Sequence, residues 1–318
     1  MLIVFRMARQ AENTLYSLST RFQRNVRDED YEIICVENES DQNLDEARVH
    51  AIAPNIRYFR REESGKSPAA AINFAFEHAR APMICLIVDG ARMVSPRVIR
   101  FALDGQRISP NALIAVPGYH LGPDEQHLNV GYGEQAEMEM LETVDWKRNG
   151  YALFKVSVFS GANPFGFLHP FLECNCLFCA SESFRKIGQA DERFDLPGGG
   201  MINLDIWRQL ALLPESRMIV LPGEGSFHQY HGGVTTSDVV DREQVLETHR
   251  AQYLKIRGEP YAGVLREPLL LGAITAEALP FLEKTVQGAK RRFNRFRAQG
   301  RPDWPDDPQL SGSIPSDR

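Results

Sequence analysis

The first hundred residues alternate short apolar runs with segments of helical periodicity, and few folds accommodate that alternation. Apolar runs of strand length lie at 2–5, 31–36, 55–59 and 82–88. Segments with helical signals lie between or after these runs, at 13–26, 67–80 and 95–106. Strands that alternate with helices predict an α/β fold with a mostly parallel sheet and helices on both of its faces.

Polar side chains stand directly after three of the apolar runs. They are Arg6 after LIVF, Glu37 and Asn38 after IICV, and Asp89 after CLIV. In parallel sheets, ligands bind beyond the carboxyl ends of the strands, where the strand order reverses. We therefore expect these polar residues to share one rim of the sheet and to form part of a binding site.

Composition and length narrow the class of protein. The chain has 318 residues, of which 43% are apolar, so it is long enough for one large domain or two modest ones. Its net charge of −6 argues against a chain-wide nucleic-acid surface, which needs an excess of basic residues.

The five cysteines are odd in number, and three of them crowd into 174–179, which is not a secreted disulfide framework. No apolar run approaches the roughly 20 residues of a membrane span, and the N-terminus lacks the features of a signal peptide. We therefore expect a cytoplasmic protein.

The rest of the chain is less regular. Between 107 and 170 no long periodic stretch occurs, and we interpret this region as loops that form the second wall of a cleft. Beyond it, the sequence predicts strands at 171–179 and from 217, and helices at 180–188, 201–213, 242–258 and 284–299. The end of the chain, 300–318, is rich in Pro, Ser and Asp, which is typical of a disordered segment.

Several motifs together resemble the nucleotide-sugar-binding half of the family 2 glycosyltransferases. The matching stretches are IVFRMARQAENTLYSLST, EIICVENESDQ and GKSPAAAINFAFEHARAPMICLIVDGARMVSP, followed later by FRKIGQADERFDLPGGG, LDIWR and FHQYHGG. The family's forms are a strand that ends in an acidic turn, a helix with A-x-N, a strand that ends in D-x-D, and a histidine near the metal. The likeness covers roughly residues 1–236, with the middle region unmatched.

The resemblance implies a fold, a domain organisation and an activity. The fold would be GT-A: Rossmann-like, with a mostly parallel central sheet flanked by helices, here with a C-terminal helical extension. The domains would be a glycosyltransferase domain at 1–236, with a donor half at 1–106 and an acceptor half at 107–236, a helical extension at 237–299, and the tail at 300–318. The activity would be transfer of a sugar from a nucleotide-diphosphate sugar to a glycan, lipid-linked or small-molecule acceptor.

The D-x-D motif departs from the family pattern, since the sequence reads Asp89, Gly90 and Ala91. In the family the first Asp contacts the donor ribose and the second coordinates a divalent cation on the diphosphate. Ala91 has no side-chain oxygen, and Mg²⁺ and Mn²⁺ prefer oxygen ligands. Two alternatives follow. A cation binds through Asp89 and one of His228 or His231, or Arg92 with Lys66 neutralises the diphosphate without a metal.

Other residues of the expected donor site come from motif position. Arg6, Glu37, Asn38 and Asn73 would hold the nucleotide, and Asp89 its ribose. Glu37, Asn38 and Asn73 also have simpler structural alternatives. The acidic segment at 37–38 could form only a turn, and Asn73 could make a structural hydrogen bond to a loop.

Inversion at the sugar requires a carboxylate to deprotonate the acceptor. The family's base position falls on Asn203, which cannot accept a proton at neutral pH, so Asp205 is the first candidate. It could instead pair with Arg208 or Arg185. Glu173 is the second candidate, because it shares one face of the strand 171–179 with Asn175. The missing carboxylates at 91 and 203 leave a second hypothesis open: a nucleotide-sugar-binding protein with impaired catalysis.

The basic helix at 284–297 suggests a further partner. Its Lys and Arg residues could contact a membrane surface or an anionic acceptor. Alternatively the helix packs on the catalytic domain through Phe293 and Phe296 and presents a solvated basic face.

Overall fold

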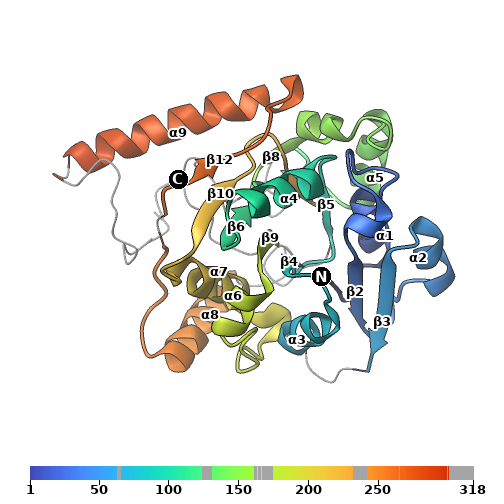
Figure 1. The fold of residues 1–318 in the computed structure, drawn as a ribbon, viewed down its shortest axis with the longest axis horizontal. Helices are drawn as coiled ribbons and strands as arrows, with labels where there is room; N and C mark the ends of the chain where they lie inside the picture. Colours follow the sequence, from blue (N-terminus) through green and yellow to red (C-terminus); the bar gives the residue numbers. More distant parts are fainter. Residues whose placement is uncertain are drawn as a thin grey trace.

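The fold was determined as a computed structural model, which describes residues 1–62, 66–123, 131–160, 163, 166, 175–231, 242–264, 266–298 and 300. Two sheets form its framework (Figure 1). The larger has the strand order β12-β10-β6-β9-β4-β1-β2-β3, and the smaller has the order β5-β11-β7-β8. The mixed α/β architecture with a central sheet, expected from the alternation of apolar runs, is confirmed.

The large sheet is mostly parallel. Its strands are β1 (Leu2–Val4), β2 (Ile33–Asn38), β3 (Ile56–Arg61), β4 (Met83–Ile87), β6 (Ala112–Ala115), β9 (Asn175–Ala180), β10 (Arg217–Val220) and β12 (Leu269–Leu270). Only β9 runs antiparallel to its neighbours β4 and β6 among the described pairings. The chain moves from β1 outward to β3 and then returns to β4 on the other side of β1. The strand order therefore reverses between β1 and β4, which is where such sheets bind ligands.

Helices cover both faces of the large sheet. On one face, α1 (Ala8–Leu18), α2 (Glu46–Ile52) and α4 (Val98–Ile108) contribute apolar side chains to one core cluster. On the other face, a second cluster contains side chains of α3 (Ala69–His78), α6 (Ser181–Lys186), α7 (Ile202–Leu212) and α8 (Arg242–Arg257), which Figure 1 shows below the sheet. Because Tyr253 of α8 belongs to this second cluster, the predicted extension shares a core with the preceding domain.

Two of the four strands of the small sheet lie within 107–170, where the sequence indicated loops. Its strands are β5 (Arg92–Val94), β7 (Gly118–Leu121), β8 (Ser157–Phe159) and β11 (Ser226–His228). Helix α5 (Glu134–Thr143), the 3₁₀ segment η3 (Gly150–Val156) and a third, aromatic-rich cluster accompany it. The interpretation of 107–170 as loops was therefore wrong for β7, β8, α5 and η3, and also for β6 of the large sheet. The strands are too short to show periodicity, and α5 buries only Glu137 and Leu141.

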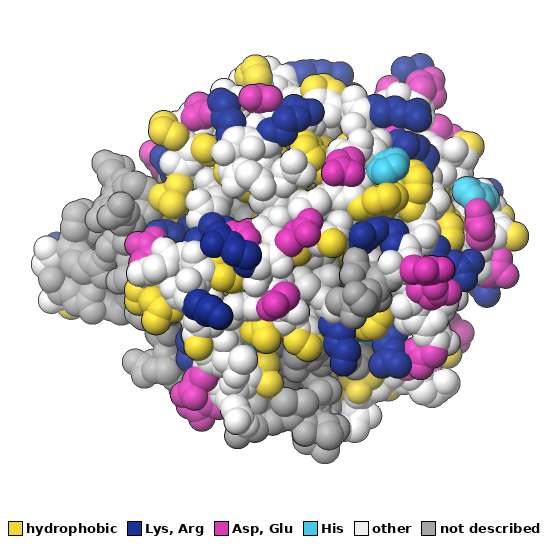
Figure 2. Space-filling view, turned by 90° about the horizontal axis from the view of Figure 1, so that it is seen from below, with side chains coloured by type: hydrophobic (Ala, Val, Ile, Leu, Met, Phe, Trp, Pro, Cys, Tyr) yellow, Lys and Arg dark blue, Asp and Glu magenta, His cyan; other side chains and the backbone are white. Residues whose placement is uncertain are grey.

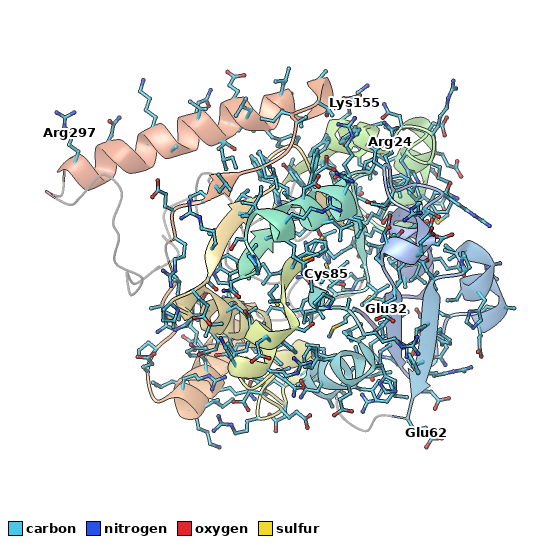
Figure 3. The ribbon with its side chains drawn as sticks, viewed as in Figure 1. Arg24, Glu32, Glu62, Cys85, Lys155 and Arg297 are labelled. Carbon is cyan, nitrogen blue, oxygen red and sulfur yellow. The ribbon has the colours of Figure 1, made fainter. Side chains whose placement is uncertain are left out.

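The C-terminal helix α9 (Leu279–Ala298) lies along one side of the molecule, and Arg297 projects from its outer end (Figures 1 and 3). It begins five residues before the predicted boundary at 284, with Pro280 in its first turn, where proline is favoured. Phe281 and Thr285 are buried and attach the first turns to the body. The side chains of Phe293 and Phe296, and residues 301–318 of the tail predicted at 300–318, lie outside the described residues.

Charged side chains are mixed on the surface. On the face in Figure 2, the described Lys and Arg side chains are interspersed with Asp and Glu. Within the described part of the chain, none of the helices combines the length and the apolar character needed to cross a bilayer.

Candidate functional site

Asp89 follows β4 at the reversal of the strand order, and local contacts fix its carboxylate there. Its backbone N–H donates to Asn175 Oδ1 at 3.2 Å, and its Oδ1 accepts from the N–H of Ala91 at 3.1 Å. Gly90 is needed between them, because a Cβ at this position would lie 2.9 Å from the carbonyl oxygen of Ile3. The tight turn therefore presents the Asp89 carboxylate beyond the strand end.

Ala91 joins this turn to the strand β11. Its carbonyl oxygen accepts from the N–H of Gln229 at 2.8 Å, and its methyl group is fully buried. The position that carries the second carboxylate in D-x-D sequences is therefore part of the core here. Further ligands for a cation must come from another segment.

Three basic side chains form a row across the small sheet. Arg92 of β5 stands opposite His228 of the antiparallel strand β11, and His228 stands beside His120 of the parallel strand β7. Residues that face each other in register project from the same side of a sheet. The Arg92 guanidinium therefore lies on one side of the His228 ring, and the His120 imidazole lies on the other side.

The imidazoles of His228 and His231 converge on Asp89. His228 Nε2 lies 2.8 Å from Asp89 Oδ2, and His231 Nε2 lies 3.5 Å from Asp89 Oδ1. The two Nε2 atoms are themselves 2.9 Å apart. Arg92 Nε approaches Asp89 Oδ2 at 3.5 Å. Three potential ligand atoms thus point toward one location beside the end of β4.

The electrostatics of this cluster favour metal-binding protonation states. Burial opposes ionisation of Asp89, but the adjacent His231 and His228 outweigh it and hold the pKa of the carboxyl well below its usual range. Burial and the charge of Arg92 lower the pKa of His228 to about 4, although Asp89 acts in the opposite direction. At neutral pH, Asp89 is therefore a carboxylate and His228 a neutral imidazole, as ligation requires.

These residues fit a divalent cation. Asp89, His228 and His231 each offer one ligand atom, and the three atoms lie within 4.8 Å of one another. Two imidazole nitrogens with one carboxylate oxygen favour a transition metal such as Mn²⁺ over Mg²⁺, which prefers oxygen ligands alone. The structure brings together the three residues that the sequence named as metal ligands, whereas the sequence left open which histidine would take part.

The segment that carries the two histidines is anchored to α1. Gln229 Nε2 donates to the carbonyl oxygen of Gln10 at 2.9 Å, and Gln10 Nε2 donates to the carbonyl oxygen of Tyr230 at 2.7 Å. Asn13 Nδ2 donates to Gln229 Oε1 at 2.9 Å. This exchange of side-chain and backbone hydrogen bonds fixes the chain between His228 and His231.

Glu137 of α5 holds the same segment from another direction. Its fully buried carboxylate accepts from the N–H of Tyr230 at 2.6 Å and from Arg9 Nη2 at 3.1 Å. Burial raises the pKa of Glu137 to about 7, although the hydrogen bond from Tyr230 and the charge of Arg9 act in the opposite direction. Sequence reasoning missed Glu137, because α5 carries several glutamates and its pattern does not reveal which one is buried.

Arg6 and Asn38 lie at the carboxyl ends of β1 and β2, as predicted. Arg6 has a left-handed backbone with φ of 55° and pairs with Asp41 at 2.8 Å, where both side chains are exposed. Asn38 is buried, and its Oδ1 lies 3.4 Å from Arg61 Nη1. The Arg6 guanidinium is therefore on the surface at this rim.

Glu37 is the last but one residue of β2, and its carboxylate closes the turn that follows. It accepts from the N–H of Leu44 at 3.1 Å and from the Tyr58 hydroxyl at 2.5 Å. Burial raises the pKa of Glu37, although both of these hydrogen bonds oppose the shift. These contacts correspond to the simpler alternative, in which Glu37 organises a turn.

Asn73 and Lys66 lie near the start of α3. The Asn73 amide exchanges two hydrogen bonds of 3.0 Å with the backbone of Ala190, and its Nδ2 also donates to Glu192 Oε1 at 2.9 Å. Asn73 therefore makes the structural bonds to a loop that were the alternative to nucleotide contact. Lys66 is exposed, and its carbonyl oxygen accepts from the N–H of Gly198 at 3.0 Å.

Asp205 is buried on α7 in a bidentate ion pair with Arg257 of α8. The two distances are 2.7 Å from Arg257 Nε to Oδ1 and 2.5 Å from Nη2 to Oδ2. The partners proposed from the sequence were wrong, since Arg208 pairs with Glu259 and Arg185 pairs with Glu182. Glu173, the second candidate for the base, lies outside the described residues.

Comparisons with known proteins bear on the family and the fold. Residues 4–96 match the family described as glycosyl transferase family 2. Among solved structures, TarS 1-349 of S. aureus in complex with UDP-GlcNAc has a TM-score of 0.51 and 12% identity, with 95% of this chain and 77% of that chain covered. Its complex with UDP has a TM-score of 0.50 and 11% identity, with 94% and 72% covered.

A longer crystal structure of S. aureus TarS has a TM-score of 0.49 and 12% identity, with 93% of this chain covered, and the chain spans 44% of its length. A search of curated proteins finds no match. The resemblance to family 2 glycosyltransferases is thus confirmed over 4–96, and the fold is that of a GT-A glycosyltransferase.

Proposed function

From the family 2 match over residues 4–96, we propose that the protein is a glycosyltransferase that uses a nucleotide-diphosphate sugar as donor. The observation that carries the proposal is the convergence of Asp89, His228 and His231 at the reversal of the strand order. A GT-A sheet with a cation-binding cluster at this location suits recognition of a sugar diphosphate.

In this proposal, Asp89, His228 and His231 hold a divalent cation, with Mn²⁺ ahead of Mg²⁺ because of the two nitrogen ligands. When bound, the cation would supply positive charge to the diphosphate that leaves the sugar. Arg92 stands 3.5 Å from Asp89 and would add a fixed positive charge beside it. Lys66, exposed in the segment just before α3, would provide a second one.

The nucleotide would lie along the ends of β1 and β2. Arg6 is the residue of this rim whose exposed guanidinium is best placed to meet a ligand. Glu37 and Asn38 would shape the rim through the turn after β2, and Asn73 would act through the loop at 190–192. UDP sugars, with UDP-GlcNAc first, are the donors to test, because TarS structures contain UDP and UDP-GlcNAc.

The transfer would invert the sugar, with Asp205 or Glu173 as the base. Asp205 would have to exchange a bond to Arg257 for the acceptor hydroxyl, because both of its oxygens accept from that guanidinium. The variants D205N and E173Q separate the two. The variant that removes the true base should lose about two to four orders of magnitude in kcat. The other variant should keep most of its kcat.

The competing hypothesis is a nucleotide-sugar-binding protein with impaired catalysis, favoured by Ala91 and Asn203. Donor hydrolysis and transfer, measured with Mn²⁺ and with EDTA, distinguish the two. Turnover that requires the cation supports the enzyme. Thermal stabilisation by UDP-GlcNAc without any turnover supports the binding protein, since a ligand of the folded state raises its stability in either case. If neither UDP nor a UDP sugar binds, the proposed donor is wrong.

The proposal extends to the acceptor and to the location of the protein. A glycan or lipid-linked acceptor and peripheral membrane contact through the basic helix α9 form part of the proposal. Lys284, Lys290 and Arg291 are exposed on this helix, which lies along the outside of the molecule (Figure 3). A cytoplasmic location is proposed from the cysteine pattern, and Cys35, Cys85, Cys176 and Cys179 are free thiols.

A further inference from the structure

His120 is a buried histidine beside the cation-binding cluster that the sequence did not single out. It stands on β7 in register with His228 and is 8% exposed. Its Nδ1 lies 3.3 Å from His228 Nδ1, and the two rings meet edge to face with centroids 5.1 Å apart. The contact is therefore made by the ring nitrogen of His228 that does not face Asp89.

The chemistry of imidazole assigns each of these nitrogens a role. His228 directs Nε2 at Asp89 and at His231, so Nε2 is the atom that would bind a cation. A neutral imidazole carries one N–H, and a lone pair on Nε2 requires the proton on Nδ1. Ligating histidines almost always donate this second N–H to an acceptor, which fixes the ring and its tautomer. The facing atom here is His120 Nδ1.

We propose that His120 is a positioning residue that accepts the Nδ1 proton of His228 and so orients Nε2 of His228 for a divalent cation. The inference rests on the cation-binding part of the proposed function. His120 itself must then carry its proton on Nε2, with an unprotonated Nδ1 toward His228. Its place in the sheet supports this role, because strand pairing holds both backbones in register and both side chains are buried.

The test measures cation affinity of the full chain with Mn²⁺ alone, by counting free Mn²⁺ with electron paramagnetic resonance. H120F keeps the ring and removes the acceptor, and we expect affinity to fall about 10–100-fold, as for other partners of ligating histidines. H120N restores an acceptor oxygen near the position of Nδ1 and should recover most of the affinity. H249F is the matched control, since His249 is also 8% exposed but lies on α8.

Two results would overturn the inference. One is wild-type Mn²⁺ affinity in folded H120F, and the other is equal loss in H120F and H120N. If H120F does not fold, long-range ¹H–¹⁵N spectra of the wild type with Zn²⁺ decide instead. They should report a protonated Nδ1 in His228, and an unprotonated one contradicts the proposal. A wild-type protein that binds no divalent cation would remove the cation site itself, and this inference with it.

Discussion

His228 Nε2 lies 2.8 Å from Asp89 Oδ2, although only Asp89 belongs to the segment 4–96 that matches the family. The cation-binding cluster therefore joins the donor half of the sheet to a strand far along the chain. The pairing of β5 with β11 makes this possible, since it sets Arg92, three residues after Asp89, opposite His228.

Removal of the Asp89 charge is expected to abolish cation binding. D89N keeps the shape of the side chain but loses the anionic oxygen, so the affinity for Mn²⁺ should fall by more than the roughly 100-fold typical of an indirect partner. Titration with Mn²⁺ measures this. The control D104N alters a carboxylate on α4 that pairs with Arg100 and Arg107. Equal affinity in D89N and D104N would exclude Asp89 as a ligand.

Replacement of Arg92 should weaken binding of the diphosphate group more than binding of the nucleoside. The guanidinium lies 3.5 Å from Asp89, and a phosphate contact to a charged donor contributes about 1.5–3 kcal/mol. We expect R92Q to weaken UDP binding at least about 10-fold and to leave uridine binding unchanged, as measured by calorimetry. Parallel weakening of both ligands would instead indicate a general loss of site structure.

Titration of Glu137 should lower the free energy of unfolding as the pH rises. Its pKa is raised from 4.5 to about 7 in the folded protein, so the folded state binds this proton more tightly than the unfolded state. The stabilisation is complete below pH 4.5 and is lost as the pH passes through about 7. E137Q removes this titration. Relative to wild type, the variant should gain up to about 3 kcal/mol in the free energy of unfolding between pH 4.5 and 8. Urea denaturation of both proteins across that range provides the measurement, and parallel pH profiles would contradict the prediction.

The ion pair of Asp205 and Arg257 should contribute to the free energy of unfolding, and the effects of replacing its two partners should not be additive. R257Q leaves the Asp205 carboxylate unpaired with its side chain only 3% exposed, so it is expected to destabilise the protein by about 3 kcal/mol. D205N should cost less, since the charge it leaves is the Arg257 guanidinium, which is 23% exposed and lies 3.3 Å from Asp191. The double variant should be less destabilised than the sum of the two single changes. Additive effects in urea denaturation would mean that the pair is not coupled.

The basic face of α9 is expected to bind anionic membranes. Each Lys or Arg near such a surface contributes about 1 kcal/mol, so K290E/R291E should weaken sedimentation with phosphatidylserine vesicles at least about 30-fold at low salt. R250E/K255E makes the same change of charge on α8, on the other side of the molecule (Figure 1). Similar behaviour of both variants would show that net charge, and not α9, determines the binding.

Local periodicity determined the central part of the fold. The apolar runs that form β1, β2, β3 and β4 are visible as runs of neighbours in the sequence, and α3 lies within the predicted 67–80. Helix α1 begins and ends earlier than the predicted 13–26, and α2 was not predicted. Asp89 could be placed at a strand end because it follows such an apolar run. The small sheet could not, because β5 and β11 have three residues each and are stabilised by their pairing rather than by a pattern of their own.

The sequence by itself determined the first four strands of the large sheet and the polar side chains that follow β1, β2 and β4, since these patterns depend on residues close together in the chain. Only the tertiary structure decided the partners: both histidines beside Asp89, His120 behind His228, Glu137 under Tyr230, and Arg257 rather than Arg208 on Asp205. These contacts join segments distant in sequence, and packing of the sheets and helices brings them within hydrogen-bonding distance. No local pattern encodes that packing, because many pairings satisfy the same periodicity.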